Sequence, residues 1–406
     1  MISAAGINRF SASLIAVAFV ASLWLPLAGL PARWDGMVEI EEKRSPAPPP
    51  AWGKDPLRTW PDKFLEYFRD NFGLRRDLLY LHNWSRVKIF RTSSSERVIL
   101  GKDKWLFYTG SNLIDDFQGL TPFSETELDR WRNVIEGRQA WLAERGIRYL
   151  FVMVPNKVTI YPEYLPDFYH RKGTDTHADQ LAARFARTPG INYLDLRPIL
   201  REAGHERLVY YPYETHWNHY GAYLGYREIG ARLREWFPGI EPFTLDDFDV
   251  RAEKASTICH MLGIRDKDWG SSFAERFHLR TASAKSVPIS VPDTCRSRHG
   301  PPVAFEKPDK PRRLLVFHDS FLQGVPMQAL SEHFGRSVWL WLNLELNYEC
   351  LRLMVDRERP DVVIEQRIER FLKFVPEDHE VFAAARRGKV SVSDHGAQED
   401  EAADDF

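Results

Sequence analysis

"RRLLVFHDSFLQGVPMQALSEHF", residues 312–334, predicts a strand that ends in a tight turn and continues into a helix over 321–334. His318, Asp319 and Ser320 form the turn. A serine at this place is exposed at the end of a strand, where backbone N–H groups could stabilise an oxyanion, although serine also caps helices very often. Ser320 is therefore a candidate nucleophile, whereas Asp319 is expected to be structural.

Apolar runs of the same type recur along the chain and alternate with helix-like segments. This alternation predicts an α/β fold with a mainly parallel sheet. In such sheets ligands bind at the carboxyl ends of the strands, where Ser320 falls. The further strands are expected at 148–154, 191–196, 337–342 and 361–365, the helices at 175–187, 220–236 and 347–356, and a lid or peripheral insertion at about 246–310.

Composition narrows the class of protein. The 406 residues allow one large domain or two smaller ones, and 44% hydrophobic residues indicate a globular chain. A net charge of −2 without a concentrated basic face gives no reason to expect nucleic acid. Cys259, Cys295 and Cys350 fit an exported protein that does not depend on disulfides. If one bridge forms, Cys259–Cys295 is the most plausible pair, and it would leave one thiol over. No close pair of cysteines marks a zinc site, so neither a metal nor a cofactor is expected.

The N-terminus gives the strongest signal of compartment. No residue between Phe10 and Ala32 is charged, and this run is long enough to span a bilayer as one helix. Arg9 precedes the run and acidic residues follow it, which places the rest of the chain outside the cytoplasm. A retained anchor is preferred to a cleaved signal. The expected division is an anchor or signal at 1–33, a proline-rich linker at 34–59, a catalytic domain at 60–375 and an acidic, disordered tail at 376–406.

A second motif, "YYPYETHWNHYGA" at 210–222, could complete a site around Ser320. Residues two apart on an extended loop project to one side, so Glu214 could orient His216, which could in turn take a proton from Ser320. Trp217 could wall the pocket, and His219 is expected at the surface or at a helix start. The alternative is an aromatic turn with an idle histidine.

Taken together, several motifs resemble the alginate O-acetyltransferase family of the AlgJ/AlgX type, whose catalytic domain is similar to SGNH hydrolases. The resemblance implies a three-layer α/β/α fold with Ser320 as nucleophile and His216 as base. Glu214 stands where the family usually has aspartate. The motifs are "YFRDNFGLR" (67–75), "GKDKWLFY" (101–108), "FVMVPNKVTIYPEYLP" (151–166), "ETHWNHYGA" (214–222), "VFHDSF" (316–321) and "RPDVVIEQRIERFL" (359–372).

Further side chains are candidates for binding the substrate. Gln323 and Asn156 are candidates for the second oxyanion donor beside the N–H of Ser320. Lys157, Arg367 and Arg370 could bind acidic sugars, although the two arginines could equally pair with the glutamates that neighbour them in the sequence, Glu365 and Glu369.

The resemblance implies an O-acetyltransferase that acts on an exported polysaccharide and receives acetyl groups from a multispanning membrane O-acyltransferase. It would be a single-pass protein of a bacterial inner membrane, with its catalytic domain in the periplasm. Two alternatives stay open: a carbohydrate acetyl esterase with the same triad, and a non-catalytic component of a polysaccharide export complex. No residue identifies the polysaccharide.

Overall fold

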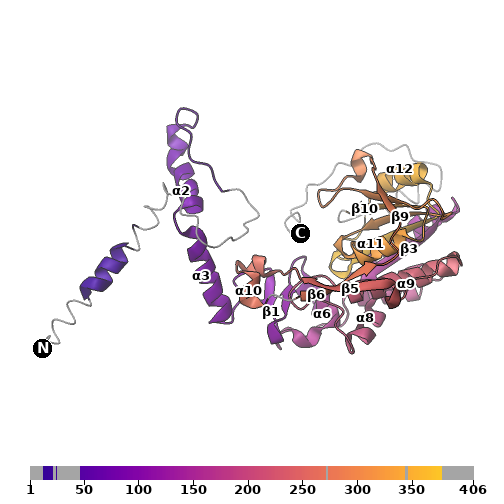
Figure 1. Cartoon of the computed structure of the whole chain (residues 1–406), viewed down its shortest axis with the longest axis horizontal. Helices are drawn as coiled ribbons and strands as arrows, with labels where there is room; N and C mark the ends of the chain where they lie inside the picture. Colours follow the sequence, from indigo (N-terminus) through magenta and orange to yellow (C-terminus); the bar gives the residue numbers. More distant parts are fainter. Residues whose placement is uncertain (1–11, 22–23, 25–45, 271–272, 343–345, 377–406) are drawn as a thin grey trace. The chain divides into compact units, whose positions relative to one another are not determined.

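The computed structural model describes residues 12–21, 24, 46–270, 273–342 and 346–376 (Figure 1). The chain divides into two compact units. The smaller unit comprises residues 1–98 and 257–271, and the larger comprises 99–256 and 272–406. The range 60–375, expected as one domain, therefore contains parts of both units, and each is described by itself.

The smaller unit is helical. It contains α2 (Trp60–Asn71), α3 (Arg75–Lys88) and α10 (Asp266–Trp269). The hydroxyl of Tyr80 on α3 donates to Asp268 at 2.8 Å, and the hydroxyl of Ser94 donates to the Leu262 carbonyl at 2.6 Å. These bonds tie segment 257–271 to residues that precede it by more than 160 positions.

The N-terminal apolar run is described only in part. Residues 12–21 are helical and exposed. Within the described part of the chain, no helix has the length and apolar character needed to cross a membrane. The rest of the expected anchor, most of the linker and residues 377–406 of the expected tail lie outside the described residues.

The larger unit is built on a seven-stranded sheet with the order β4-β3-β11-β9-β10-β8-β7. The first five strands run parallel, and β8 and β7 add antiparallel to the edge. The expectation of a mainly parallel α/β sheet is confirmed. The strands are β4 (Tyr193–Asp195), β3 (Arg148–Val154), β11 (Val362–Ile368), β9 (Arg313–His318), β10 (Arg336–Trp341), β8 (Val303–Glu306) and β7 (Lys285–Val287).

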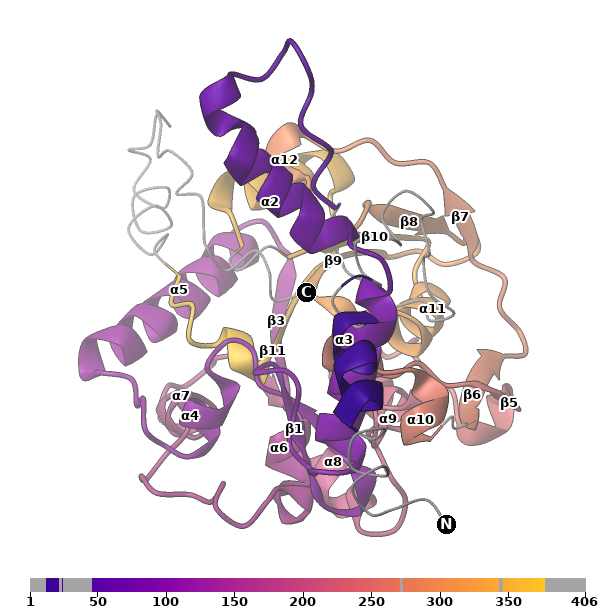
Figure 2. The ribbon, with the colours of Figure 1, turned by 90° about the vertical axis from the view of Figure 1, so that its left-hand side faces the viewer.

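Side-chain alternation along these strands creates two cores. In β3, even-numbered side chains from 150 to 154 enter one core and odd-numbered ones from 149 to 153 enter the other. Helices cover both faces (Figure 2), which gives the three-layer α/β/α arrangement. One face carries α8 (Arg197–Gly204), α9 (His219–Trp236) and α11 (Val325–Ser331); the other carries α5 (Glu125–Ala143), α7 (His177–Ala186) and α12 (Tyr348–Glu358).

Segment 246–310 contributes to the sheets. It supplies β7 and β8 at the sheet edge, together with an antiparallel pair formed by β5 (Phe248–Lys254) and β6 (Phe273–Leu279). The remaining short strands and α-helices between residues 98 and 160 are β1 (Val98–Leu100), β2 (Leu106–Tyr108), α4 (Leu113–Phe117) and α6 (Lys157–Ile160).

The helix expected over 321–334 is shorter than the sequence suggests. A 3-10 turn, η7 (Ser320–Leu322), comes first, and α11 begins only at Val325. Gly324 between them has φ +72°, a left-handed conformation that interrupts a right-handed helix. Pro326 is the second residue of α11, where its missing N–H is tolerated because the first helical turn has no partner for it.

The expected Cys259–Cys295 disulfide is wrong. Cys295 bonds to Cys350 on α12, with their Cα atoms 5.1 Å apart, and Cys259 is a buried free thiol. Cys259 belongs to segment 257–271 of the smaller unit, whereas both bonded cysteines belong to the larger unit. Spacing along the chain could not reveal this, because the pairing depends on which segments fold together.

Candidate active site

Ser320 lies at the carboxyl edge of the sheet, two residues after the end of β9. Asp319 fixes this turn: its carboxylate accepts from the Phe321 N–H at 2.9 Å and from the Ile368 N–H at 2.6 Å. Its own N–H donates to the Gln366 side chain at 3.1 Å. Asp319 is thus used structurally. Ser320 is the first residue of η7, so its N–H has no partner within the helix.

A closed loop presents the histidine motif. Tyr210 and Trp217 form an antiparallel bridge at its base, and the Tyr211 N–H donates to the His216 carbonyl at 3.3 Å. Asn218 then caps α9 through the Gly221 N–H at 2.8 Å. A Cβ on Gly221 would lie 2.2 Å from the Val209 carbonyl oxygen, so only glycine lets the helix start so close to the loop.

Glu214, His216 and Ser320 form a continuous chain of hydrogen bonds. Nδ1 of His216 lies 2.8 Å from Oε2 of Glu214, and Nε2 lies 2.7 Å from Oγ of Ser320. A carboxylate oxygen beside Nδ1 requires the proton on that nitrogen, which leaves Nε2 free to accept the hydroxyl proton of Ser320. This is the geometry of a nucleophile, a base and an orienting acid.

The longer side chain of Glu214 still reaches both the ring and the backbone of His216. The same Oε2 also accepts from the His216 backbone N–H at 2.6 Å. Burial raises the pKa of the Glu214 carboxyl, but attraction to His216 and these hydrogen bonds prevail and lower that pKa to about 2. The Glu214 side chain is 13% exposed and that of His216 is 34% exposed. The acid is therefore ionised and shielded, and the base stays accessible.

Trp217 connects the loop that carries His216 to the turn that carries Ser320. It is 4% exposed, and its Nε1 donates to the Phe321 carbonyl at 3.0 Å. The Phe321 ring packs against both Trp217 and His216. The expectation of a pocket wall needs correction, because Trp217 links the loop to the nucleophile turn and is buried.

All three cations expected on a sugar-binding surface are buried, and Arg367 and Lys157 are held by oxygens of the protein. Nε of Arg367 bonds to Glu365 at 3.0 Å, and neither side chain is exposed, so pairing with Glu365 is the correct alternative for Arg367. Lys157 donates to backbone carbonyls. The expectation that Lys157 and Arg367 bind acidic sugars is therefore wrong. The sequence shows that each residue is charged, but it does not show that the side chain is buried.

Arg370 and Asn156 lie together near the nucleophile turn. Nη1 of Arg370 is 3.4 Å from Oδ1 of Asn156, and its guanidinium lies over the rings of Phe321 and Tyr108. Among the described residues Arg370 makes no ion pair, and Glu369 is not its partner. Gln323, the other oxyanion candidate, is exposed beyond η7, and no contact between its side chain and the hydrogen-bonded chain is found within the described residues.

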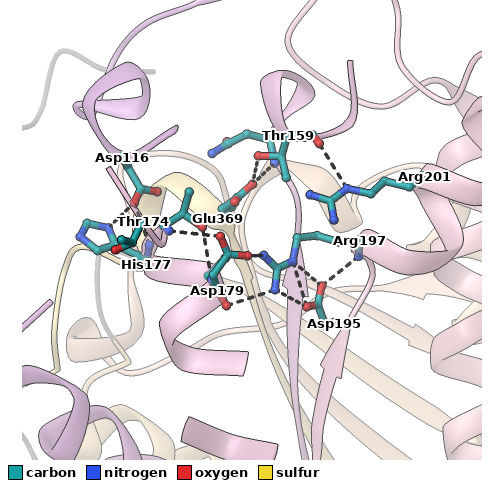
Figure 3. Close-up of polar contacts among 12 residues, drawn as sticks. Asp116, Thr159, Thr174, His177, Asp179, Asp195, Arg197, Arg201 and Glu369 are labelled. Atoms are coloured by element: carbon teal, nitrogen blue, oxygen red, sulfur yellow. Dashed lines mark hydrogen bonds and ion pairs between the residues drawn. The ribbon is translucent and has the colours of Figure 1, made fainter. Parts of the chain in front are cut away.

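Glu369 anchors the turn after β3 and lies beside Thr159 (Figure 3). Its carboxylate accepts from the Asn156 N–H at 2.7 Å and from the Thr159 hydroxyl at 2.6 Å. Burial, together with the charge of Asp116, raises the pKa of Glu369 to about 7. In the same region Arg197 bonds to Asp195 and Asp179. The sequence offered Glu369 only as a partner for an arginine, so this role was missed.

Arg276 on β6 was also missed by the sequence analysis. Its Nη1 lies 2.8 Å from Nε2 of His219, and the Phe277 N–H donates to Nδ1 of His219 at 3.0 Å. Burial and the charge of Arg276 lower the pKa of His219 to about 4. His219 is the first residue of α9, as expected. No sequence pattern connects a strand 57 residues away to this motif.

Part of the chain is similar to known proteins. Residues 98–285 match the family model described as SGNH hydrolase-like domain, acetyltransferase AlgX. The probable alginate O-acetylase AlgJ of Pseudomonas aeruginosa is 31% identical over 138 residues, which cover 34% of this chain and 33% of that protein. Its namesake from Pseudomonas syringae pv. tomato is 29% identical over 184 residues, covering 44% of each. The matches thus span less than half the length of these relatives.

A solved structure shares the fold. Bacillus cereus PatB1 with a sulfonyl adduct aligns with a TM-score of 0.50 and 16% identity, over 70% of this chain and 97% of that one. Ser320 lies beyond the residues that the family model matches, so its assignment depends on the geometry above. Residues 98–285, which contain Asn156, Lys157, Glu214 and His216, are thus similar to the SGNH hydrolase-like acetyltransferase domain of AlgX.

Proposed function

We propose that this protein is an O-acetyltransferase that transfers acetyl groups through Ser320 to hydroxyls of an exported polysaccharide. The observation that carries the proposal is the chain of hydrogen bonds from Glu214 through His216 to Ser320. It lies at the carboxyl edge of a parallel sheet, where α/β proteins bind their ligands.

In the first half-reaction, Nε2 of His216 takes the Ser320 proton while Oγ attacks the carbonyl carbon of the acetyl donor. The tetrahedral oxyanion is stabilised by the Ser320 N–H, with Asn156 as the second candidate donor. Collapse breaks the bond to the leaving group, which takes the proton from His216. The Glu214 carboxylate stabilises the transient imidazolium, and acetyl-Ser320 remains.

In the second half-reaction, a sugar hydroxyl loses its proton to His216 and attacks acetyl-Ser320. The ester bond to Oγ breaks, Oγ regains the proton from His216, and the acetylated sugar leaves. Water in place of the sugar hydroxyl would give free acetate, which is the esterase alternative. Two relatives that match this chain over less than half of their length are named probable alginate O-acetylase, and this name supports a polysaccharide as the acceptor.

We further propose a single-pass anchor at 1–33 in a bacterial inner membrane, with the larger unit in the periplasm. The uncharged run from Phe10 to Ala32 supports it. An acetyl group used on that side must cross the membrane, which supports a multispanning O-acyltransferase as supplier. Cross-linking from the smaller unit in cells should capture such a protein; capture of soluble proteins alone would count against this partner.

The transferase is tested with the full-length chain in detergent, incubated with an activated acetyl ester and a uronic-acid oligosaccharide. Mass spectrometry should detect acetyl-Ser320 and acetylated oligosaccharide. Ser320→Ala and His216→Ala should each lower product formation at least about a thousandfold. The control His205→Ala changes an exposed histidine of the same unit and should retain the wild-type rate. Acetate without acetylated sugar would identify an esterase, and absence of any acyl-enzyme would refute the serine mechanism.

A further inference from the structure

Lys157 lies where backbone oxygens converge. Its side chain is buried, with the residue 5% exposed. Nζ lies 2.6 Å from the Glu214 carbonyl, 3.1 Å from that of Tyr211 and 3.2 Å from that of Pro212, and it also donates to the Leu106 carbonyl. An ammonium has three N–H donors, so four carbonyls more than satisfy it. Burying a charge is costly unless such partners surround it.

Three of these carbonyls belong to the loop 210–217 that presents Glu214 and His216. The bridge between Tyr210 and Trp217 closes only the base of that loop. At its tip, the Pro212 carbonyl also accepts from the Leu106 N–H of β2 at 2.9 Å. Lys157 therefore joins the loop tip, strand β2 and helix α6 through one cation.

We propose that Lys157 is the positioning residue of this site: its ammonium fixes the loop tip so that Glu214 and His216 stay aligned with Ser320. The inference deepens, and rests on, the proposed function. Lys157 touches no reacting atom and acts through the backbone of the loop. An alignment error of about 1 Å in such a site can cost about a hundredfold in rate.

The backbone that carries Lys157 is held at the carboxyl edge of the sheet. Glu369 follows β11 and bonds to the Asn156 N–H at 2.7 Å and to the Thr159 hydroxyl at 2.6 Å, on either side of Lys157. The rings of Trp105 and Phe107 lie 5.6 Å and 5.0 Å from Nζ and add a favourable cation–π attraction. The position of the loop 210–217 is thus set, through Lys157, by the ends of β3 and β11.

The inference predicts a pH dependence. Burial lowers the pKa of Lys157 to about 7, against the opposing field of Glu214. Glu214 is the charged group that acts on it from the loop, and the other side presents the apolar rings of Trp105 and Phe107. Above that pH the neutral amine has fewer donors, so acyl transfer should slow. The free energy of unfolding should instead rise between about pH 7 and pH 10. In that range the unfolded chain keeps the Lys157 proton and the folded chain has lost it, so folding no longer buries a charge.

The experiment compares the full-length wild type with Lys157→Met, which keeps length and removes the charge. The readouts are the rate of Ser320 modification by a sulfonyl fluoride, kcat and KM for acetyl transfer, and their pH profiles. Lys307→Met is the matched control. Lys307 also donates a hydrogen bond within the protein, to Glu332 at 2.7 Å. It directly follows β8, whose last residue pairs with Arg336 at the start of β10. Lys307 therefore lies at the amino ends of the parallel strands, away from Ser320.

Lys157→Met should lower kcat and the labelling rate about a hundredfold, leave KM within about threefold and lose the decline in rate above pH 7. Lys307→Met should keep all three properties. Lys157→Gln, which retains an amide donor, replaces the methionine variant if that variant does not fold. A folded variant that labels within about threefold of wild type would overturn the inference. Failure of the wild type to label or transfer would instead refute the proposed function.

Discussion

Glu214 stands where the resemblance to the AlgJ/AlgX type implies an aspartate. One oxygen of the carboxylate serves both the backbone N–H and Nδ1 of His216, at 2.6 Å and 2.8 Å. The longer side chain therefore folds back over its own loop without opening it. Its pKa of about 2 keeps it ionised at every pH where the protein is expected to work.

Glu214→Gln should keep the shape of the loop but remove the charge that holds His216 in the required tautomer. We expect kcat to fall about 10³- to 10⁴-fold, as happens when an amide replaces the acid of such a triad elsewhere. Glu214→Asp should cost less, about ten- to a hundredfold, because the charge stays but the oxygen is withdrawn from Nδ1. Steady-state transfer rates measure both variants.

The order of the two variants decides the role of Glu214. If Glu214→Gln retained more than about a tenth of the wild-type kcat, another group would have to orient His216. The control Glu163→Gln changes a surface glutamate on a turn after α6 and should leave kcat unchanged.

At the level of elements, the Cys295–Cys350 disulfide links the loop before β8 to α12, closing 55 residues of chain. Loop-closure entropy gives such a bridge about 4 kcal/mol of stabilisation. Cys350→Ser should lower the free energy of unfolding of the larger unit by about that amount, which is measured as a lower midpoint of urea unfolding. Reductant should not lower the midpoint of this variant further.

Cys259→Ala serves as the control, because Cys259 has no bridge to lose. Its midpoint should still fall when reductant is added, as in the wild type. A wild-type midpoint that is insensitive to reductant would show that the bridge contributes nothing to stability.

The strands and most helices were predictable because their apolar runs are long and bounded. Segment 148–154 is β3 over the same residues, and 220–236 is α9 with one added residue. What failed depends on three-dimensional proximity or local backbone geometry. The break at Gly324 depends on a positive φ, and the cysteine pairing depends on which segments share a unit.

The candidate site was predictable where neighbours in sequence are neighbours in space. Glu214 and His216 are two residues apart, and their pairing with Ser320 follows from the need of a nucleophile for a base. The environment of Lys157 was not predictable, because its four carbonyl partners come from two segments more than 50 residues away.

For the whole molecule, the site and the N-terminal run belong to different units, so the proposed location can be tested independently of the chemistry. The full-length chain should sediment with membranes and resist alkaline extraction. External protease should degrade the larger unit in spheroplasts but not in intact cells. Both results follow from about 20 uncharged residues that can span a bilayer and from the charges that flank them.

Val17→Arg introduces a charge into the middle of the uncharged run, which costs about 3 kcal/mol for insertion of a membrane helix. This variant should leave the membrane fraction or fail to reach the periplasm, while the purified protein retains acetyl transfer. Val17→Leu, which keeps the run apolar, should behave as wild type. If Val17→Arg stays in the membrane fraction as firmly as Val17→Leu, the exposed apolar run is not the anchor, and attachment must come from another part of the chain.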